Sequence, residues 1–198
     1  AYTVHLNMQE YIWDGIKRDR LVWVGDMHPE TLTIRTVFGA DASVARSLEF
    51  IRKETPLPGW MNGMASYTMW YAIIVHDWFM YTGDLEWLRS QEEYLEGISR
   101  QLSECIDEKG KDTVTEGRFL DWPSSDRPDV VDAGVQAIHL LAADSLRKLF
   151  MALGKQGPAE ECARDMERLA CFPADADGSK QAAALLVLAG LRDAEEMN

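Results

Sequence analysis

Apolar residues recur at helical spacing along most of the chain. From His28 onward they lie three and four residues apart rather than alternating, and glycine, proline and aspartate separate one such segment from the next. The sequence therefore predicts an all-α fold with seven helices after residue 28. They are expected at residues 29–38, 42–54, 66–81, 84–110, 129–153, 158–171 and 179–191.

Several expected helix ends have a local chemical cause. Asp26 is a candidate cap for the first of the seven, with Pro29 in its first turn, and Asp84 is a candidate cap for the fourth. Gly154 follows the fifth, where a left-handed residue commonly ends a helix. The first thirteen residues fit either a strand or a helix, and the helical context slightly favours a helix.

Short turns join the expected helices into antiparallel pairs, and longer loops separate the pairs. Such repeated hairpins are typical of an αα-toroid or an α-solenoid. Solenoid repeats usually show self-similarity at a fixed period, and this sequence shows none, which favours a toroid. The long loops at residues 14–26, 55–65 and 112–128 are then expected to converge on one end of a single domain.

Composition narrows the classes of partner. The 198 residues, 46% hydrophobic and 27% charged, suit one globular domain with a core. A net charge of −13 argues against nucleic acid and anionic membranes, because both reward clustered lysine and arginine, but it does not disfavour a neutral sugar. The longest apolar run, residues 182–191, is about half of a membrane span, and no signal peptide is recognisable. The compartment stays open.

Metal and cofactor chemistry is not indicated. The three cysteines lack the close spacing of a zinc site, and the four histidines are dispersed. Asp175 and Asp177 precede Gly178, but the remaining ligands of a calcium-binding EF-hand are missing. We therefore expect free thiols and neither a metal nor a cofactor.

The stretch DGIKRDRLVWVGD at residues 14–26 has the densest chemistry in the chain. Its carboxylates and cations alternate, so neighbouring charges could separate the pKa values of the acids, as catalytic acids require. An exposed loop of mutually paired charges fits the spacing equally well. The carboxylates are Asp14, Asp19 and Asp26, and the cations are Lys17, Arg18 and Arg20.

This stretch, followed by MHPE, resembles the signature of the α-L-rhamnosidases of glycoside hydrolase family seventy-eight. Residues 70–88 and the FLDWP segment at residues 119–123 resemble later parts of the same domain, so the resemblance covers residues 1 to about 130. The family's catalytic domain is an (α/α)6 barrel of six hairpins. The resemblance implies that residues 1–198 form one partial toroid, about half of a complete barrel.

The resemblance also implies roles for individual residues. Asp19 falls where the general acid protonates the glycosidic oxygen, although many relatives carry glutamate there and Arg20 makes the motif RDR instead of RDE. Asp14 and Asp26 match carboxylates that hold the sugar's hydroxyls, through charge-assisted hydrogen bonds. Further contacts to the substrate are expected from Arg18, Trp23, Asp121 and Trp122.

The position of each remaining tryptophan, in a loop or in a helix, predicts its role. Trp60 lies in a loop between Gly59 and Gly63, so it is a further candidate for sugar contact. The tryptophans within helix bodies are expected to pack in the core, and His28 is expected to be a polar residue in a first helical turn. These helical tryptophans are Trp70, Trp78 and Trp87.

The implied activity is an inverting hydrolysis that releases terminal α-L-rhamnose, with a second carboxylate activating water. No position matches the family's motif for that base, and Glu116 and Asp121 are the only loop acids that could approach. We therefore expect a fragment that is inactive alone and that self-associates through exposed apolar helix faces. The alternatives are another toroid glycosidase, such as one acting on uronyl sugars, and a non-catalytic helical module that binds carbohydrate or protein.

Overall fold

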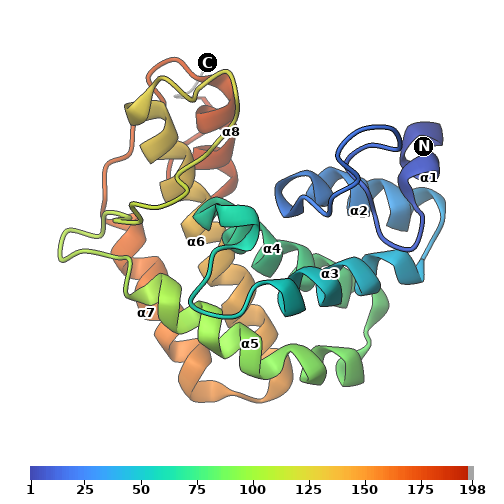
Figure 1. Ribbon diagram of the computed structural model, residues 1–198. Coiled ribbons are helices and arrows are strands. Elements are labelled where there is room, and N and C mark those ends of the chain that lie inside the picture. Colours follow the sequence, from blue (N-terminus) through green and yellow to red (C-terminus); the bar gives the residue numbers. More distant parts are fainter. Residues whose placement is uncertain (196–198) are drawn as a thin grey trace.

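The computed structural model describes residues 1–195, and this part of the chain is helical, with loops and two isolated β-bridges but no strand (Figure 1). The predicted all-α fold is confirmed. The helices are α1 (Tyr2–Asn7), α2 (Val24–Val37), α3 (Ala42–Glu54), the 3-10 turn η1 (Met61–Gly63), α4 (Ala65–Thr82), α5 (Leu85–Ser103), α6 (Pro128–Leu153), α7 (Gln156–Ala170) and α8 (Lys180–Leu188).

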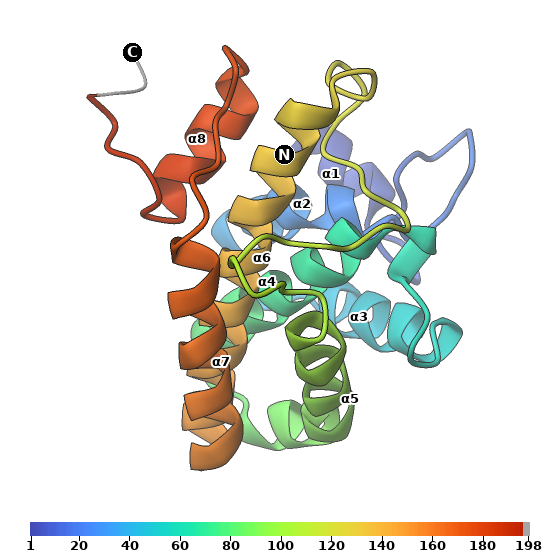
Figure 2. The same cartoon turned by 90° about the vertical axis from the view of Figure 1, so that its left-hand side faces the viewer.

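Four helices form a continuous row through the molecule. In this row α2 packs on α4, α4 packs on α6, and α6 packs on α8. Each of the first three is followed, after a short turn, by one antiparallel partner, namely α3, α5 or α7. Figure 2 shows one such pair, α6 and α7, running side by side. The predicted hairpin organisation is therefore present.

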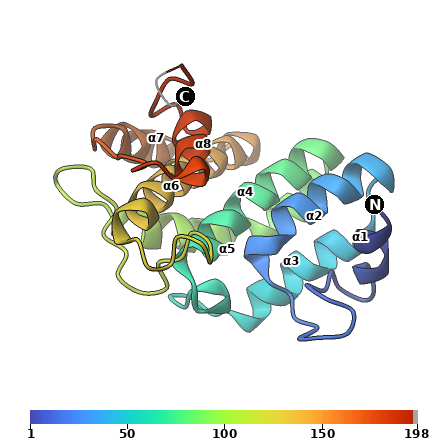
Figure 3. The same cartoon turned by 90° about the horizontal axis from the view of Figure 1, so that it is seen from above.

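The sequence explains which helices occupy the centre. Eleven of the eighteen residues of α4 are buried, and they lie all around the helix, as expected of a helix enclosed by neighbours. The partner helix α7 buries only Ala159, Cys162, Asp165 and Leu169, which share one face. Seen from above, α4 lies between α2 and α6 (Figure 3).

Local caps end several helices, and the predicted caps at Asp84 and Gly154 are confirmed. The carboxylate of Asp84 accepts a hydrogen bond of 2.9 Å from the amide of Trp87 and caps α5. Gly83 ends α4 and Gly154 ends α6, both with a left-handed backbone. The hydroxyl of Ser179 caps α8. Local capping chemistry therefore determines these boundaries.

The start of α2 was predicted wrongly. The helix begins at Val24 rather than at residue 29, so Asp26 lies in its first turn and is not its cap, and Pro29 lies inside it. The side-chain oxygen of Asn62 accepts a 3.1 Å hydrogen bond from the Val24 amide. Because this partner is 38 residues away in sequence, the local pattern did not reveal it.

Two further segments differ in detail from the expectations. α5 ends at Ser103, because the chain then turns back on itself and Ile106 pairs with Asp112 in an isolated β-bridge. At the amino terminus the structure has the helix that the context favoured. α1 is a helix, and after it Met8 forms an antiparallel bridge with Ile12.

The direction of the row helices places the long loops together. Since a hairpin partner returns the chain between successive row helices, α2, α4, α6 and α8 all run the same way, and their amino-terminal ends face one end of the molecule. The loops before α2, before α4 and before α6 meet there. None of the described helices combines the length and apolarity required of a membrane-spanning segment.

Candidate active site

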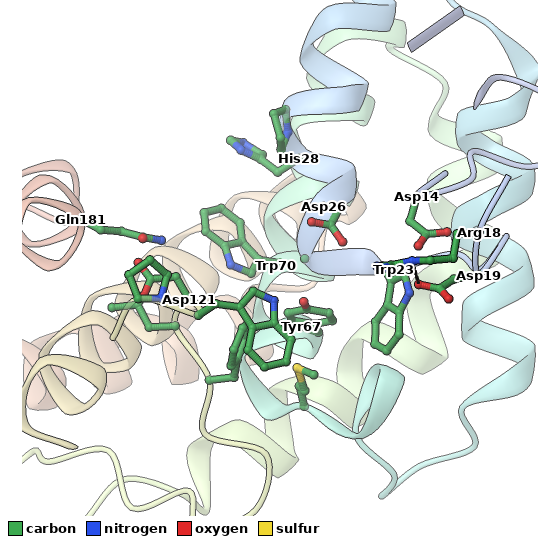
Figure 4. A pocket seen from close by; sticks show the side chains of 17 residues that line it. Asp14, Arg18, Asp19, Trp23, Asp26, His28, Tyr67, Trp70, Asp121 and Gln181 are labelled. Carbon is green, nitrogen blue, oxygen red and sulfur yellow. Dashed lines mark ion pairs between the residues drawn. The ribbon is translucent and has the colours of Figure 1, made fainter. Parts of the chain in front are cut away.

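A pocket of about 570 Å³ opens at the amino-terminal ends of the row helices. Its walls come from the 14–23 loop, the first turns of α2 and α4, the loop at 119–123, and α8. In Figure 4 the carboxylates Asp14, Asp19 and Asp26 lie on one side of the pocket, and Asp121 and Gln181 lie on the other. The structure thus brings together the three loops that were predicted to converge, with Met64 as the contribution of the 55–65 loop to the lining.

Asp14 closes the base of the loop that carries Asp19. Its carboxylate accepts a 2.9 Å hydrogen bond from the Leu21 amide, and its own amide donates a 3.1 Å bond to the Leu21 carbonyl. The residues between them form a small exposed loop at the pocket rim. Asp14 therefore has a structural role in addition to its predicted contact with the sugar.

Asp19 lies at the tip of this loop in a strained conformation. Asp19 and Arg20 have φ angles of 60° and 54°, in the left-handed region that side chains other than glycine rarely adopt. The Asp19 carboxylate is 3.4 Å from the Arg18 guanidinium, and 44% of its side chain is exposed. Such strain is often found where function requires a particular side-chain position.

Asp26 has a neighbouring acid that the sequence analysis did not identify. Partial burial, together with the negative charge of Asp14, raises the pKa of Asp26. Glu30 lies one helical turn further along α2, where burial and the charges of Asp26 and Asp14 raise its pKa to about 8. Glu30 belongs to the MHPE segment. It lies four residues after Asp26, and this spacing could have indicated that the two acids are neighbours on one helix face.

Aromatic rings form a continuous wall across the pocket. Trp23 meets Tyr67 edge to face at 6.1 Å, Tyr67 meets Phe119 at 6.2 Å, and Phe119 meets Trp122 at 5.2 Å between ring centroids. Trp122 is 79% exposed, so its ring faces solvent at the rim. The two predicted tryptophans thus lie in one wall, joined by Tyr67 and Phe119, which the sequence did not single out.

Trp70 and His28 also line the pocket, which was not expected of either, although Trp70 also packs against the core as expected. Their rings contact each other at a tilt of 33°, with centroids 4.9 Å apart. His28 also lies 3.4 Å from Asp77, which contacts His76 at 3.0 Å. Although burial acts to raise the pKa of Asp77, the hydrogen bonds from both histidines hold it well below its usual range.

The loop that carries Asp121 and Trp122 is anchored just before it. Arg118 forms ion pairs with the buried Asp112 and, at 2.8 Å, with Asp132 on α6. Burial acts to raise the pKa of Asp112, but the hydrogen bond from His139 and the nearby guanidinium outweigh it and lower that pKa. This network fixes the loop to the body of the domain.

Two predicted residues are not part of the pocket lining. Trp60 precedes η1 and packs partly buried against the core, and Glu116 lies in an exposed part of the 112–128 loop. Asp121 does line the pocket, but one of its carboxylate oxygens accepts a 2.7 Å hydrogen bond from the Ser124 amide. Gln181, from α8, is a lining residue that the sequence did not indicate.

The pocket's chemistry suits a hydroxyl-rich ligand with an apolar face. Carboxylates accept hydrogen bonds from hydroxyls, and aromatic faces pack against C–H surfaces. Within residues 1–195 no group of three histidine, cysteine or acidic side chains is arranged to hold a metal ion. The three cysteines are free thiols.

Comparison with known proteins places this pocket in a family. Residues 1–172 match the family described as the bacterial alpha-L-rhamnosidase 6 hairpin glycosidase domain, and no curated protein matches the chain. The matched range contains every residue that lines the pocket except Gln181. The chain belongs to the bacterial α-L-rhamnosidase six-hairpin glycosidase domain family.

Proposed function

We propose that this domain binds terminal α-L-rhamnose and takes part in its hydrolytic release from a glycoside. The observation that carries the proposal is the pocket's division into an acidic side, with Asp14, Asp19 and Asp26, and an aromatic wall that ends at Trp122. Membership of a glycosidase family supports the same reaction class.

A deoxy sugar suits both sides of this pocket. Rhamnose has hydroxyls on its ring and a methyl group at C6 instead of a hydroxymethyl group. Hydroxyls directed at Asp14 and Asp26 would donate hydrogen bonds to carboxylates, while the methyl group and the C–H surface would pack against the aromatic wall. A hexose with a hydroxyl at C6 would leave that hydroxyl without a partner at an apolar surface, which costs binding free energy.

The charges argue against a uronyl sugar as substrate. Among the described residues that line the pocket, Arg18 already pairs with Asp19 and His28 pairs with Asp77. A uronate would bring a further carboxylate into a pocket that is lined by four aspartates, and their negative charges would repel it. A neutral sugar avoids this repulsion.

In the proposed mechanism Asp19 protonates the glycosidic oxygen while water attacks the anomeric carbon from the opposite face. The water loses its proton to a second carboxylate, and the anomeric configuration inverts. Asp121 has one oxygen committed to Ser124, and Glu116 lies outside the pocket lining. Within the described residues there are three helix pairs together with α1 and α8, whereas the family is named for six hairpins, so we propose that the base belongs to another part of the barrel.

Ligand binding tests the choice of sugar without requiring turnover. Isothermal titration calorimetry with L-rhamnose, L-mannose and D-glucuronate should give the lowest Kd for L-rhamnose, a higher Kd for L-mannose, which differs from it only by the C6 hydroxyl, and no measurable binding of glucuronate. Tighter binding of glucuronate than of rhamnose would overturn the proposal in favour of a uronyl sugar. Binding of rhamnose by an intact protein that hydrolyses no rhamnoside would instead indicate a carbohydrate-binding module.

The role of Asp19 is tested by Asp19→Asn in the intact protein, with leaving groups of different acidity. Loss of a general acid should lower kcat for an alkyl or glycosyl rhamnoside about 10²- to 10⁴-fold. The loss should be much smaller for nitrophenyl α-L-rhamnoside, because nitrophenolate departs without protonation. Asp126→Asn, in an exposed part of the loop before α6, is the matched control. An equal loss for both substrates would remove Asp19 from the acid role.

A further inference from the structure

Asn62 makes two hydrogen bonds to the backbone on either side of Trp23. Its side-chain nitrogen donates to the Val22 carbonyl at 3.0 Å, and its side-chain oxygen accepts from the Val24 amide at 3.1 Å. In a β-sheet a neighbouring strand would bond to the Val22 carbonyl and the Val24 amide, but here the side-chain amide of Asn62 bonds to both. Asn62 therefore holds the segment that connects the acidic loop to α2.

The backbone of Asn62 is itself firmly held. Its φ angle of 51° is left-handed, a conformation that asparagine tolerates better than most residues. Next to it, Met61 is fully buried, and its amide donates a 3.0 Å hydrogen bond to the Thr68 hydroxyl on α4. Asn62 thus connects the Trp23 segment to the central helix of the fold.

The segment that Asn62 holds carries residues that line the proposed sugar site. Trp23 is packed edge to face on Tyr67, and a Cβ at Gly25 would lie only 2.2 Å from the Tyr67 ring. Asp26 follows in the first turn of α2. A small shift of the backbone at Trp23 would therefore displace an aromatic face and a carboxylate together, and binding sites are sensitive to such displacements.

We propose that Asn62 is a positioning residue, which sets the Trp23 ring and the Asp26 carboxylate in place for the sugar through its paired hydrogen bonds to the Val22 carbonyl and the Val24 amide. This inference rests on the proposed function. Asn62 is not itself among the residues that line the pocket, so its effect on the ligand is exerted through Trp23 and Asp26.

The sharpest test is Asn62→Gly, because it separates positioning from folding. Glycine adopts a φ of 51° without strain, so relief of strain offsets part of the stability lost with the two hydrogen bonds. The melting temperature should stay close to that of the wild type, while the Kd for L-rhamnose should rise about tenfold. Asn62→Asp keeps the acceptor for the Val24 amide but loses the donor to the Val22 carbonyl. Its Kd for L-rhamnose should therefore lie between those of the wild type and Asn62→Gly.

Gln101→Ala is the matched control. Gln101 also donates a side-chain hydrogen bond to this loop, at the Pro58 carbonyl (2.7 Å), but that bond is not made to the Trp23 segment. Its removal should leave the Kd for L-rhamnose at the wild-type value. A rise in Kd equal to that of Asn62→Gly would show a general loosening of the loop and would overturn the proposal.

A second readout keeps this inference separate from the identity of the sugar. In protein labelled with 5-fluorotryptophan, the ¹⁹F resonance of Trp23, assigned with Trp23→Phe, should shift or broaden in Asn62→Gly. If wild-type protein does not bind rhamnose but the resonance changes, the proposed function fails and the positioning role stands. A folded Asn62→Gly protein with an unchanged resonance and an unchanged Kd would show that Asn62 does not position Trp23. If Asn62→Gly does not fold, Asn62→Asp is measured in the same way.

Discussion

Glu30 is the most unusual acid of the candidate site, because its surroundings favour the protonated form. Burial in the first turns of α2 is the largest cause, and the charges of Asp26 and Asp14 add to it. A neutral carboxylic acid beside Asp26 can donate a hydrogen bond, which an ionised one cannot. Glu30 is not itself among the residues that line the pocket, so its raised pKa bears on the pocket through Asp26.

This raised pKa predicts a pH-dependent stability. Between about pH 4.5, the ordinary pKa of a glutamate, and about pH 8, the folded protein binds the Glu30 proton more tightly than the unfolded chain does. The contribution of Glu30 to the free energy of unfolding therefore falls as pH rises through this window and is constant above it. Glu30→Gln should stabilise the protein by roughly 1 to 3 kcal/mol more at pH 8 than at pH 4.5.

Urea denaturation of wild type and Glu30→Gln at pH 4.5, 6.5 and 8 measures this difference. Glu93→Gln, at an exposed position on α5, is the control. Its free energy of unfolding should differ from that of the wild type by nearly the same amount at all three pH values. A stability difference for Glu30→Gln that does not depend on pH would contradict the assignment.

Gly25 is required by the close approach of Tyr67. An alanine Cβ there would lie 2.2 Å from a ring carbon of Tyr67, so Gly25→Ala should destabilise the fold by about 1 to 3 kcal/mol and weaken rhamnose binding. Gly157 is the matched control in α7, where a Cβ meets nothing within 4 Å. Gly157→Ala should gain up to about 1 kcal/mol. Thermal unfolding of both variants measures the change in stability, and calorimetric titration with L-rhamnose measures the change in binding.

The sequence located the acids of the site better than its supporting residues. Asp14, Asp19 and Asp26 were found because they lie within one short motif. Glu30 and Asn62 were not found, because the properties that matter for them arise from contacts with segments distant in the chain. A half-buried glutamate and an exposed one look alike in a sequence.

At the scale of elements, the loop before α6 depends on one buried ion network. Arg118 pairs with Asp112, whose carboxylate also lies 2.7 Å from His139. Arg118→Met should cost about 3 to 5 kcal/mol, because it leaves Asp112 without its guanidinium partner in the interior. It should also free the following loop, so that the backbone amides of residues 119–127 exchange faster with solvent.

Urea denaturation measures the cost of Arg118→Met, and hydrogen exchange of the amides of residues 119–127 measures the release of the loop. Arg147→Met is the control, because Arg147 pairs with Asp144 near the surface of α6 and its loss should cost less than about 1 kcal/mol. Similar losses for the two variants would mean that the Asp112 network is not a main anchor of the loop.

Helix boundaries were predictable where their causes are local. α3 spans the predicted residues 42–54, and the caps at Asp84 and Gly154 are where the sequence placed them, whereas Ser179 caps α8 in place of the expected Asp175 or Asp177. The start of α2 was missed because Asn62 binds its first turn from another loop. Propensity and capping rules describe neighbours in sequence, and this contact joins neighbours in space.

At the scale of the whole molecule, apolar side chains are exposed at the end opposite the pocket. They lie at the carboxyl ends of α2 and α4 and in the turn after α2. The two ends are close together, because a Cβ added to Gly39 would lie 3.9 Å from the Tyr81 hydroxyl. We call this surface the α2/α4 patch. It consists of Val37, Phe38, Met80 and Tyr81.

We expect the α2/α4 patch to promote self-association. Light scattering over a series of protein concentrations should show an apparent mass that rises with concentration, and the double variant Phe38→Ser, Met80→Ser should reduce the rise. Met151→Ser removes an equally exposed apolar side chain from α6, outside the patch, and serves as the control. A constant monomer mass for the wild type would contradict this expectation.

The pocket joins segments from nearly opposite ends of the chain. Asp14 lies in the first long loop and Gln181 in α8, yet both line the same cavity. A sugar in contact with both would act as a reversible cross-link between them, and the binding free energy would add to the free energy of global unfolding. Saturating ligand would then slow hydrogen exchange in the first loop and in α8 together, although the two are remote in sequence.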